Sequence, residues 1–449
     1  MEKQFPANWT KATIGDLANY VNGRAFKPTE WKTNGKPIIR IQNLNKPDAV
    51  YNFSDQSHED KYSVKKGDLL FAWSASLGAH IWKGDDAWLN QHIFNVMPKS
   101  GVDKNYIYYL LSKITAELYA KAHGSGMVHV TKGKFEETEV LLSPTNEQKR
   151  IVAKIEELFS ELDNGIAALK TAREQLKVYR QAVLKHAFEG KLTEQWREDN
   201  CVDKTSWQAI TIKDISLLGP SNGRSVKDKA GGFPVLRLTA LKNGKLDLNE
   251  FKEGAWNKDE AQNYIVKEGD FLFSRGNGSK HLVGRGGLVT GPIIEVAFPD
   301  TMMRIRLDKT KVIPSFFSYL WESRLIRNQI ESSARTTAGI YKINQQHVKS
   351  FILSLPSLVE QKTTTDIIDK KLSVVDAQLY ALEQQLMKAE TLRQSILKKA
   401  FSGQLVPQDP NDEPASELLA RIQAEKAASD VKAKKAPAKR GRKAKEASE

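Results

Sequence analysis

The chain has 449 residues, of which 40% are hydrophobic, and it carries a formal net charge of +14. This length predicts two or three domains, and the single cysteine, Cys201, excludes a disulfide framework and any zinc site built from several cysteines. The sequence opens without an apolar signal segment and contains no apolar run of membrane-spanning length, so we expect a soluble cytoplasmic protein without membrane contact.

An internal repeat organises the sequence. The phrase Gly-Asp-Leu-Leu-Phe begins at Gly67, and Gly-Asp-Phe-Leu-Phe begins at Gly269. Asn-Gly-Arg occurs at residues 22–24 and again at residues 222–224. The distance between matching positions drifts along the globular segments, which indicates loops of different length in two copies of one domain.

Each copy ends in a long predicted helix. From Gly126 and Gly339 onward the offset between the copies stays at 213 residues. A fixed offset is typical of a helix, because an insertion would rotate every later side chain. Residues 144–190 and 356–403 should therefore form helices of ~44 residues, roughly 66 Å long. A proline precedes each helix and a glycine closes it.

Apolar residues recur at steps of three and four along both helices and form the narrow seam of a coiled coil. Such a helix needs a partner, and each buried Leu or Ile side chain is worth ~1.5–3 kcal/mol before entropy is subtracted. We expect the two helices to pair antiparallel within one chain, with pairing between two chains as the alternative. The expected seam residues are Ile155, Leu162, Leu169, Leu176, Ile368, Val375, Leu382 and Ile396.

The two globular segments, residues 1–143 and 207–355, are interpreted as mixed α/β domains within an α+β protein. Short apolar runs bounded by Gly, Asn and Pro indicate strands. The expected strands are Ile38–Ile41, Leu69–Trp73, Val235–Leu238 and Phe271–Phe273, and the expected helices are Asn105–Ala122 and Pro314–Glu331. Residues 191–206 form a polar linker between the first helix and the second domain.

The last segment, residues 404–449, combines a short amphipathic helix starting near Ala415 with a basic tail. The stretch Lys432–Glu449 holds eight basic and two acidic residues, so it carries +6 and leaves +8 for the other 431 residues. Its Lys/Ala-rich composition predicts disorder. Arg440-Gly441-Arg442 resembles a segment that inserts arginines into the DNA minor groove. The commoner explanation of such a basic stretch is a solvated tail without specific contacts.

Short motifs around the long helices indicate a family. Glu-Gln-Lys opens each helix at residues 147–149 and 360–362, and Ala-Phe-x-Gly-x-Leu closes it at 187–192 and 400–405. The proline before the first Glu-Gln stands one residue closer than in the pattern P-x-x-x-E-Q. With the stretch LVPQDPNDEPASELLARI at 405–422, the sequence resembles, over essentially its whole length, the specificity subunit of type I restriction-modification systems.

The resemblance implies two target recognition domains that each read one half of a bipartite, asymmetric site in double-stranded DNA. The helices would separate the domains and dock two methyltransferase subunits, to which restriction subunits can add. A spacer of roughly 66 Å limits the separation of the half-sites to about two turns of DNA. The methyltransferase would use S-adenosylmethionine to methylate adenine N6, and this chain would bind no cofactor or metal itself.

The lack of recognisable catalytic motifs favours a noncatalytic role. The sequence has no phosphate-binding loop, no amino-methyltransferase tetrapeptide and no complete dinucleotide fingerprint. Asp48, Glu59 and Lys61 have the composition of a metal-dependent nuclease site. Their surroundings are polar and loop-like, however, and the second copy has Ala261 and Asn263 at the aligned places. The alternatives to a recognition subunit are therefore this nuclease and a coiled-coil scaffold.

Candidate DNA-reading residues are basic, amide and hydroxyl side chains in loops that follow predicted strands, because these groups bind base edges and phosphates. In the first copy they are Arg24, Lys27, Arg40, Gln42, Asn43, Ser74, Ser76 and Lys132, and in the second Arg224, Arg237, Arg275, Asn277, Ser279, Lys280, Thr336, Tyr341 and Lys342. The late loops His123–Lys134 and Arg335–Lys342 match each other. Structural alternatives are a simple turn for Asn-Gly-Arg, ion pairs for Arg40 and Arg237, and a core position for Trp73.

Overall fold

The computed structural model describes residues 5–46, 48–74, 76–121, 132–242, 244–291, 294–337 and 339–435. The chain divides into two compact units, unit 1 with residues 1–168 and 385–449, and unit 2 with residues 169–384. Each unit combines one globular repeat with part of helix α5 (Thr145–Phe188) and part of helix α11 (Leu358–Ala400). Among the described residues, no helix is long and apolar enough to cross a membrane.

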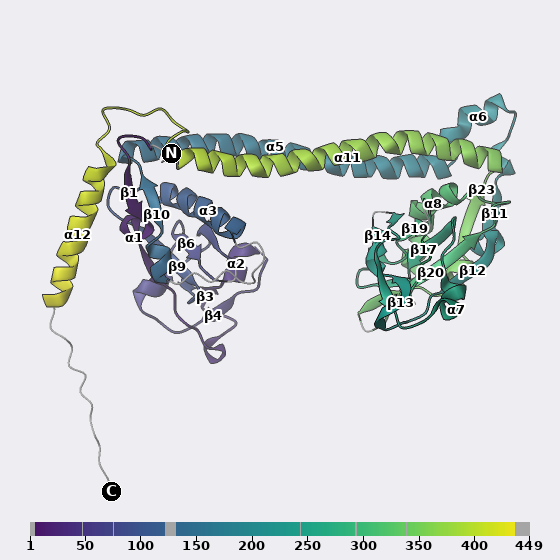
Figure 1. The fold of residues 1–449 in the computed structure, drawn as a ribbon, viewed down its shortest axis with the longest axis horizontal. Helices are drawn as coiled ribbons and strands as arrows, with labels where there is room; N and C mark the ends of the chain where they lie inside the picture. Colours follow the sequence, from purple (N-terminus) through teal and green to yellow (C-terminus); the bar gives the residue numbers. More distant parts are fainter. Residues whose placement is uncertain are drawn as a thin grey trace, which may run out of the picture. The chain divides into compact units, whose positions relative to one another are not determined.

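Helices α5 and α11, with 44 and 43 residues, lie side by side and run antiparallel (Figure 1). In unit 1 the guanidinium of Arg393 pairs with the carboxylate of Asp163, and in unit 2 Arg180 pairs with Asp376 at 3.1 Å. The two ion pairs are copies of each other, because both arginines and both aspartates are related by the 213-residue offset. The predicted antiparallel pairing within one chain is confirmed.

Burial along the seam is greatest where a globular domain also packs against the helices. In unit 1, Ile155 and Ile396 belong to one apolar core with domain residues, and in unit 2, Ile368 and Val375 pack with α5 residues such as Val183. The remaining expected seam residues, Leu162, Leu169, Leu176 and Leu382, are half-buried.

Among its described residues, the globular part of unit 1 contains three small sheets. The first has the order β2-β9-β6-β7 (Ala18–Asn22, Ile93–Pro98, Leu69–Ala72, Gly78–Ile81). The second has the order β4-β3-β8-β5 (Asn52–Ser54, Lys36–Ile39, Ala87–Leu89, Ser63–Val64). Strand β1 (Thr10–Thr13) pairs with β10 (Glu139–Leu142), and the helices are α1 (Ile14–Leu17), α2 (Ile41–Asn45), α3 (Lys104–Lys121) and α4 (Lys132–Glu136).

Unit 2 repeats this plan with additions. Its largest sheet has the order β12-β20-β17-β19-β15-β14 (Ser216–Asn222, Met302–Leu307, Asp270–Ser274, Gly286–Leu288, Lys245–Leu246, Leu241–Lys242). Further pairings join β11 (Gln208–Thr211) to β23 (Ile352–Leu355), β13 (Asp228–Leu236) to β16 (Phe251–Gly254), and β18 (Gly276–Asn277), β22 (Ile340–Lys342) and β21 (Arg335–Thr337) to one another. Its short helices are α7 (Lys258–Ala261), α8 (Pro314–Glu322), α9 (Arg324–Ser333) and α10 (Gln345–Lys349).

The repeated Gly-Asp phrase forms the same turn in both units. Gly67 and Gly269 have φ values of +92° and +84°, a left-handed conformation that favours glycine. The carboxylate of each following aspartate accepts a hydrogen bond from a backbone N–H three residues upstream, at 2.8 Å for Asp68 and 2.9 Å for Asp270. The phrase therefore shapes the entry into β6 and β17, and its role is structural.

Several predicted boundaries were wrong for local reasons. The strand expected through Ile41 ends at Ile39, because Arg40 is the N-cap of α2. The strand expected through Leu238 ends at Leu236. The helix expected from Pro314 to Glu331 is broken into α8 and α9 at Ser323, and the linker contains helix α6 (Glu194–Asp199).

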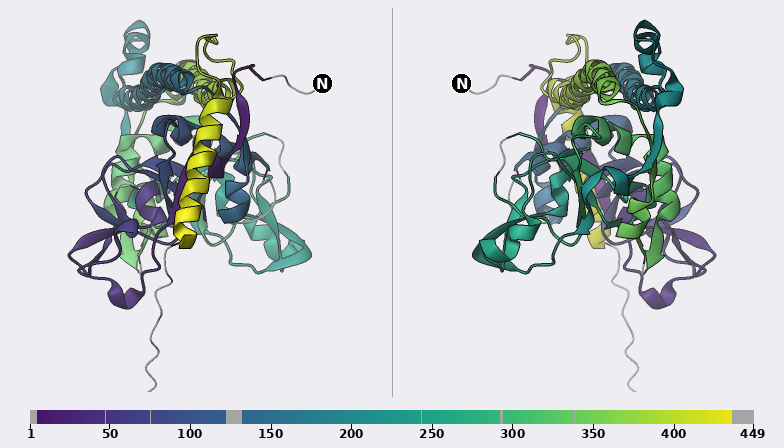
Figure 2. Two further views of the ribbon diagram at one scale, coloured as in Figure 1. Left: turned by 90° about the vertical axis from the view of Figure 1, so that its left-hand side faces the viewer. Right: turned by 90° about the vertical axis from the view of Figure 1, so that its right-hand side faces the viewer.

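The C-terminal helix α12 (Ala415–Lys435) is longer than predicted and takes in the first four residues of the expected disordered tail, whereas residues 436–449 lie outside the described residues. It packs along β1 and α1 of unit 1 (Figure 2). Ala415, Leu418 and Ile422 are buried in the core that also holds Trp9. The end of the chain thus stabilises the first globular repeat.

Candidate nucleic-acid interface

A buried carboxylate fastens each globular repeat to a long helix. In unit 1 the indole Nε1 of Trp9 donates to Glu147 Oε2 at 2.9 Å. In unit 2 the indole of Trp207 donates to Glu360 Oε2 at 3.0 Å. Both glutamates come from the repeated Glu-Gln motif, so the motif joins helix and domain at the same point of each copy.

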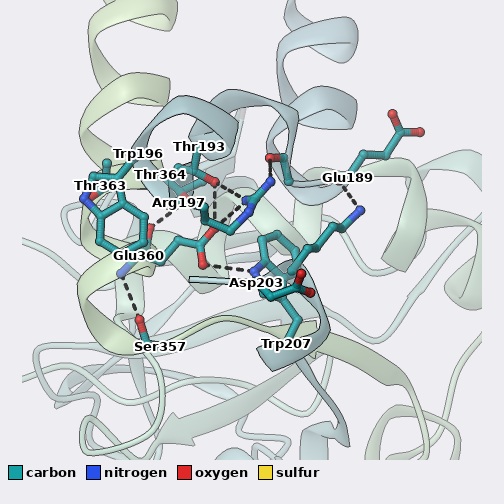
Figure 3. Close-up of polar contacts among 12 residues, drawn as sticks. Glu189, Thr193, Trp196, Arg197, Asp203, Trp207, Ser357, Glu360, Thr363 and Thr364 are labelled. Carbon is teal, nitrogen blue, oxygen red and sulfur yellow. Dashed lines mark hydrogen bonds and ion pairs between the residues drawn. The ribbon is translucent and has the colours of Figure 1, made fainter. Parts of the chain in front are cut away.

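In unit 2 this joint contains a buried ion pair. Figure 3 shows Arg197 and Glu360 pointing toward each other, with Thr193 beside them. Arg197 Nη1 donates to Glu360 Oε1 at 2.7 Å, and the Thr193 hydroxyl donates to the same oxygen at 2.7 Å. The other arm of Arg197 donates to the carbonyl of Gly190 at 2.7 Å, where α5 has ended. The linker is therefore locked to the ends of both helices.

In unit 1 a neutral donor takes the place of the arginine. Gln408 Nε2 donates to Glu147 Oε1 at 2.7 Å. Burial raises the pKa of the Glu147 carboxyl, against the lowering effect of its hydrogen bonds from Trp9 and Gln408. Arg150 and Asp412 pair nearby at 2.6 Å and hold the same C-terminal segment to α5.

The glutamine of the motif binds backbone groups of the domain. Gln148 Oε1 accepts from the N–H of Asp103 at 2.9 Å, and Gln361 Oε1 accepts from the N–H of Ile313 at 2.9 Å. Sequence reasoning found the repeated Glu-Gln pair but assigned it no contacts. The pair recurs at the fixed offset of 213 residues, and this recurrence could have predicted that it makes the same contacts in both units.

The Asn-Gly-Arg segments lie at the ends of β2 and β12, where close packing explains the glycine. A Cβ on Gly23 would lie 2.2 Å from the carbonyl oxygen of Asn90, and one on Gly223 would lie 2.2 Å from that of Pro299. The following Arg24 pairs with Glu30 at 2.6 Å. The glycine is thus a packing requirement, and a simple turn is not the explanation.

The loop after β3 holds one buried candidate, one half-buried candidate and one exposed candidate. Asn43 is buried, accepts from the N–H of Arg40 at 3.1 Å and donates to the carbonyls of Ala49 and Val50. These bonds occupy its side chain within the loop. Arg40 lies over the exposed ring of Trp31 at 5.4 Å, and Gln42 is exposed.

The other candidates of unit 1 are less open. Ser74 is buried and Ser76 is half-buried. The indole of Trp73 donates to Asn22 Oδ1 at 3.1 Å, and its ring packs against the core. Lys132 Nζ donates to the carbonyl of Tyr20 at 2.8 Å. Lys27 is exposed, whereas residues 122–131 of the late loop lie outside the described residues.

In unit 2 the fold brings together candidates that are far apart in sequence. Strand β18 pairs with β22, which places Asn277 opposite Tyr341, and β22 pairs with β21, which places Thr336 opposite Tyr341. Lys342 lies opposite Gly276 in the same small sheet. The candidates Arg275, Ser279 and Lys280 immediately flank β18.

Arg224 and Arg237 belong to a separate part of unit 2. The guanidinium of Arg224 lies 5.9 Å from the ring centre of Trp256, and the side chain is exposed. Arg237 is exposed and its Nε donates to the carbonyl of Phe251 at 3.3 Å. Both side chains therefore remain accessible to a polyanion.

The nuclease-like residues lie on the surface. Glu59 and Lys61 pair with each other at 2.7 Å, and more than half of each side chain is exposed. Asp48 is also exposed. Within the described ranges, no three His, Cys, Asp or Glu side chains are grouped closely enough to hold a metal ion. This geometry gives no support to metal-dependent hydrolysis.

Comparisons with known proteins agree with this layout. The family model for the type I restriction modification DNA specificity domain matches residues 6–172 and 204–388. The chain is 26% identical to the EcoKI specificity subunit of Escherichia coli K12, over 96% of this chain and 98% of that protein. It is 25% identical to the StySPI specificity subunit of Salmonella potsdam, with the same coverage of each. A solved structure from a study of complex assembly in a type I restriction-modification system is similar in fold, with a TM-score of 0.65, 16% identity, and coverage of 89% of this chain and 99% of that one.

Proposed function

The chain belongs to the family of type I restriction-modification specificity subunits, and we propose that its two units each read one half of a bipartite, asymmetric site in double-stranded DNA. A specificity subunit is the noncatalytic part of such a complex, and it determines which DNA is recognised. In this chain the two repeats would divide that recognition between them.

One observation carries the proposal: the two units keep the same framework and change the loops. Both have the indole–glutamate joint and the Gly-Asp turn before the central strand. Directly after that strand, however, unit 1 continues with Trp73-Ser74 and unit 2 with Arg275-Gly276. One framework that carries different loop residues favours different base sequences at the two half-sites.

The long helices are the proposed docking site for two methyltransferase subunits. In unit 2 they expose the apolar side chains of Val178, Val374 and Tyr380, which are 70%, 56% and 66% accessible. In unit 1, Met387 and Leu392 are similarly open, at 56% and 52%. A partner that covered these side chains would remove their apolar surface from water, which favours association.

Each methyltransferase would bring S-adenosylmethionine and methylate adenine N6 after the base has left the stack. This chain would position the enzymes and bind no cofactor. Restriction subunits would join the same complex. We place this complex in the cytoplasm because the substrate of the complex is DNA.

The test is methylome sequencing of a methylation-free host that expresses this chain with its neighbouring methyltransferase subunit. We expect one bipartite adenine-methylated motif, absent without this chain. Exchange of residues 207–357 for those of a relative should change one half of the motif only. A verified, assembled complex that methylates no bipartite motif would contradict the proposal. DNA cutting by the purified chain with magnesium, abolished by Asp48→Ala, would favour the nuclease instead.

A further inference from the structure

A small β-ribbon in unit 2 presents one face to the core and the other to solvent. The ribbon consists of β21 (Arg335–Thr337) and β22 (Ile340–Lys342), with β18 alongside. In its register Arg335 lies opposite Lys342, and Thr336 lies opposite Tyr341. Residues that face each other across antiparallel strands project on the same side, and neighbours along a strand project on opposite sides.

Tyr341 identifies the inner face, because it packs against the apolar core of unit 2. The outer face therefore carries Arg335, Ile340 and Lys342. All three are exposed, and Ile340 is 44% accessible although it is a large apolar residue. An isoleucine is thus presented to solvent beside a cross-strand pair of basic side chains, Arg335 and Lys342.

Gly276 keeps this face flat where β18 adjoins the ribbon. A Cβ at position 276 would lie 3.0 Å from Cγ of Lys342 and 3.5 Å from Cγ2 of Ile340. A larger side chain would push against both residues. Glycine at this position leaves room on this face for the side chains of Lys342 and Ile340.

We propose that the outer face of this ribbon enters the major groove of the second half-site, where Ile340 contacts the C5-methyl group of a thymine and Arg335 and Lys342 bind phosphates beside it. The major groove is wide enough for a two-stranded ribbon, and thymine is the only base that offers a methyl group there. Contacts of Arg335 and Lys342 with phosphates would fix the ribbon on the DNA backbone, and such contacts carry no sequence information. The inference rests on the proposed function and adds the element, the groove and the base.

The first copy indicates that this reading is specific to unit 2. At the offset of 213, which is fixed from Gly126 and Gly339 onward, Lys342 aligns with His129. His129 lies outside the described residues. The charge pattern alone therefore predicts a different mode of contact at the first half-site.

The experiment uses the full chain in complex with its methyltransferase subunits and a duplex carrying the motif found by methylome sequencing. Each thymine of the second half-site is replaced in turn by deoxyuridine, which removes only the C5-methyl group. We expect one replacement to weaken binding about fourfold, the value of one buried carbon group. With Ile340→Ala, thymine and deoxyuridine at that position should bind equally well.

Ile352→Ala is the matched control, because Ile352 is a 59% exposed isoleucine of unit 2 on strand β23. This variant should keep the fourfold preference, and thermal unfolding should show both variants folded. The binding constant falls as salt concentration rises, and the steepness of log K against log[salt] counts phosphate contacts. Arg335→Gln and Lys342→Gln should each reduce this steepness by about one without changing the motif.

Three outcomes would overturn the inference while leaving the proposed function intact. They are a second half-site without thymine, a complex that tolerates deoxyuridine at every position, and an altered motif with Arg335→Gln or Lys342→Gln. A complex that binds no bipartite site at all would instead count against the proposed function. The two failures are therefore distinguishable.

Discussion

Replacement of Glu360 by glutamine should release the linker of unit 2 from the long helices. Glu360 and Arg197 are 0% and 7% accessible, so the ion pair is shielded from water. Removal of one partner leaves the other charge buried and uncompensated, which costs about 3–5 kcal/mol. A difference of about 1.4 kcal/mol corresponds to a factor of ten in an equilibrium constant. The equilibrium constant for local opening of residues 191–206 should therefore rise by about two to four orders of magnitude.

Hydrogen–deuterium exchange of the full chain measures this opening directly, because each amide reports its own local stability. Glu147→Gln is the matched control, and it should leave exchange in residues 191–206 unchanged because Glu147 belongs to unit 1. The double variant Arg197→Met, Glu360→Gln should recover much of the lost protection, since no unpaired charge remains. A loss of protection smaller than tenfold in Glu360→Gln would refute the reasoning.

Gly23→Ala should destabilise unit 1 by about 3 kcal/mol, because its Cβ would lie 2.2 Å from the carbonyl oxygen of Asn90; unchanged urea denaturation would contradict this. Gly165→Ala in α5 should stabilise the helix by about 0.5–1 kcal/mol, seen as a higher Tm, because its Cβ meets no atom within 4 Å. Burial raises the pKa of Glu147, so the folded chain binds its proton more tightly than the unfolded chain does. As pH falls from neutral through the raised pKa toward the ordinary glutamate value, this group adds stability, and Glu147→Gln should lose that gain in urea denaturation at stepped pH. Deletion of Lys432–Glu449 should lower the salt slope of DNA binding and leave the methylated motif unchanged, and an altered motif would contradict a nonspecific role.

Residue type alone does not show which candidate side chains are accessible to DNA. Asn43 has the amide of a base-reading side chain, yet the fold buries it and uses its bonds inside a loop. Ile340 has no polar group, so it was not a candidate, although the fold exposes it beside a cross-strand pair of basic side chains. Whether a side chain is accessible depends on its neighbours in space, and these are not visible in a single sequence.

The repeat, the two long helices and the apolar seam along each helix could be predicted from the sequence alone, whereas pairing within one chain or between two remained open. Helical periodicity, prolines before the helices and glycines after them act over a few residues, so they can be read locally. Which side chain completes each indole–glutamate joint became visible in the folded structure. Arg197 meets Glu360 in unit 2, whereas Gln408 meets Glu147 in unit 1. Each of these contacts joins residues more than 150 positions apart, and such a contact exists only where the folded backbone brings the two side chains within bonding distance.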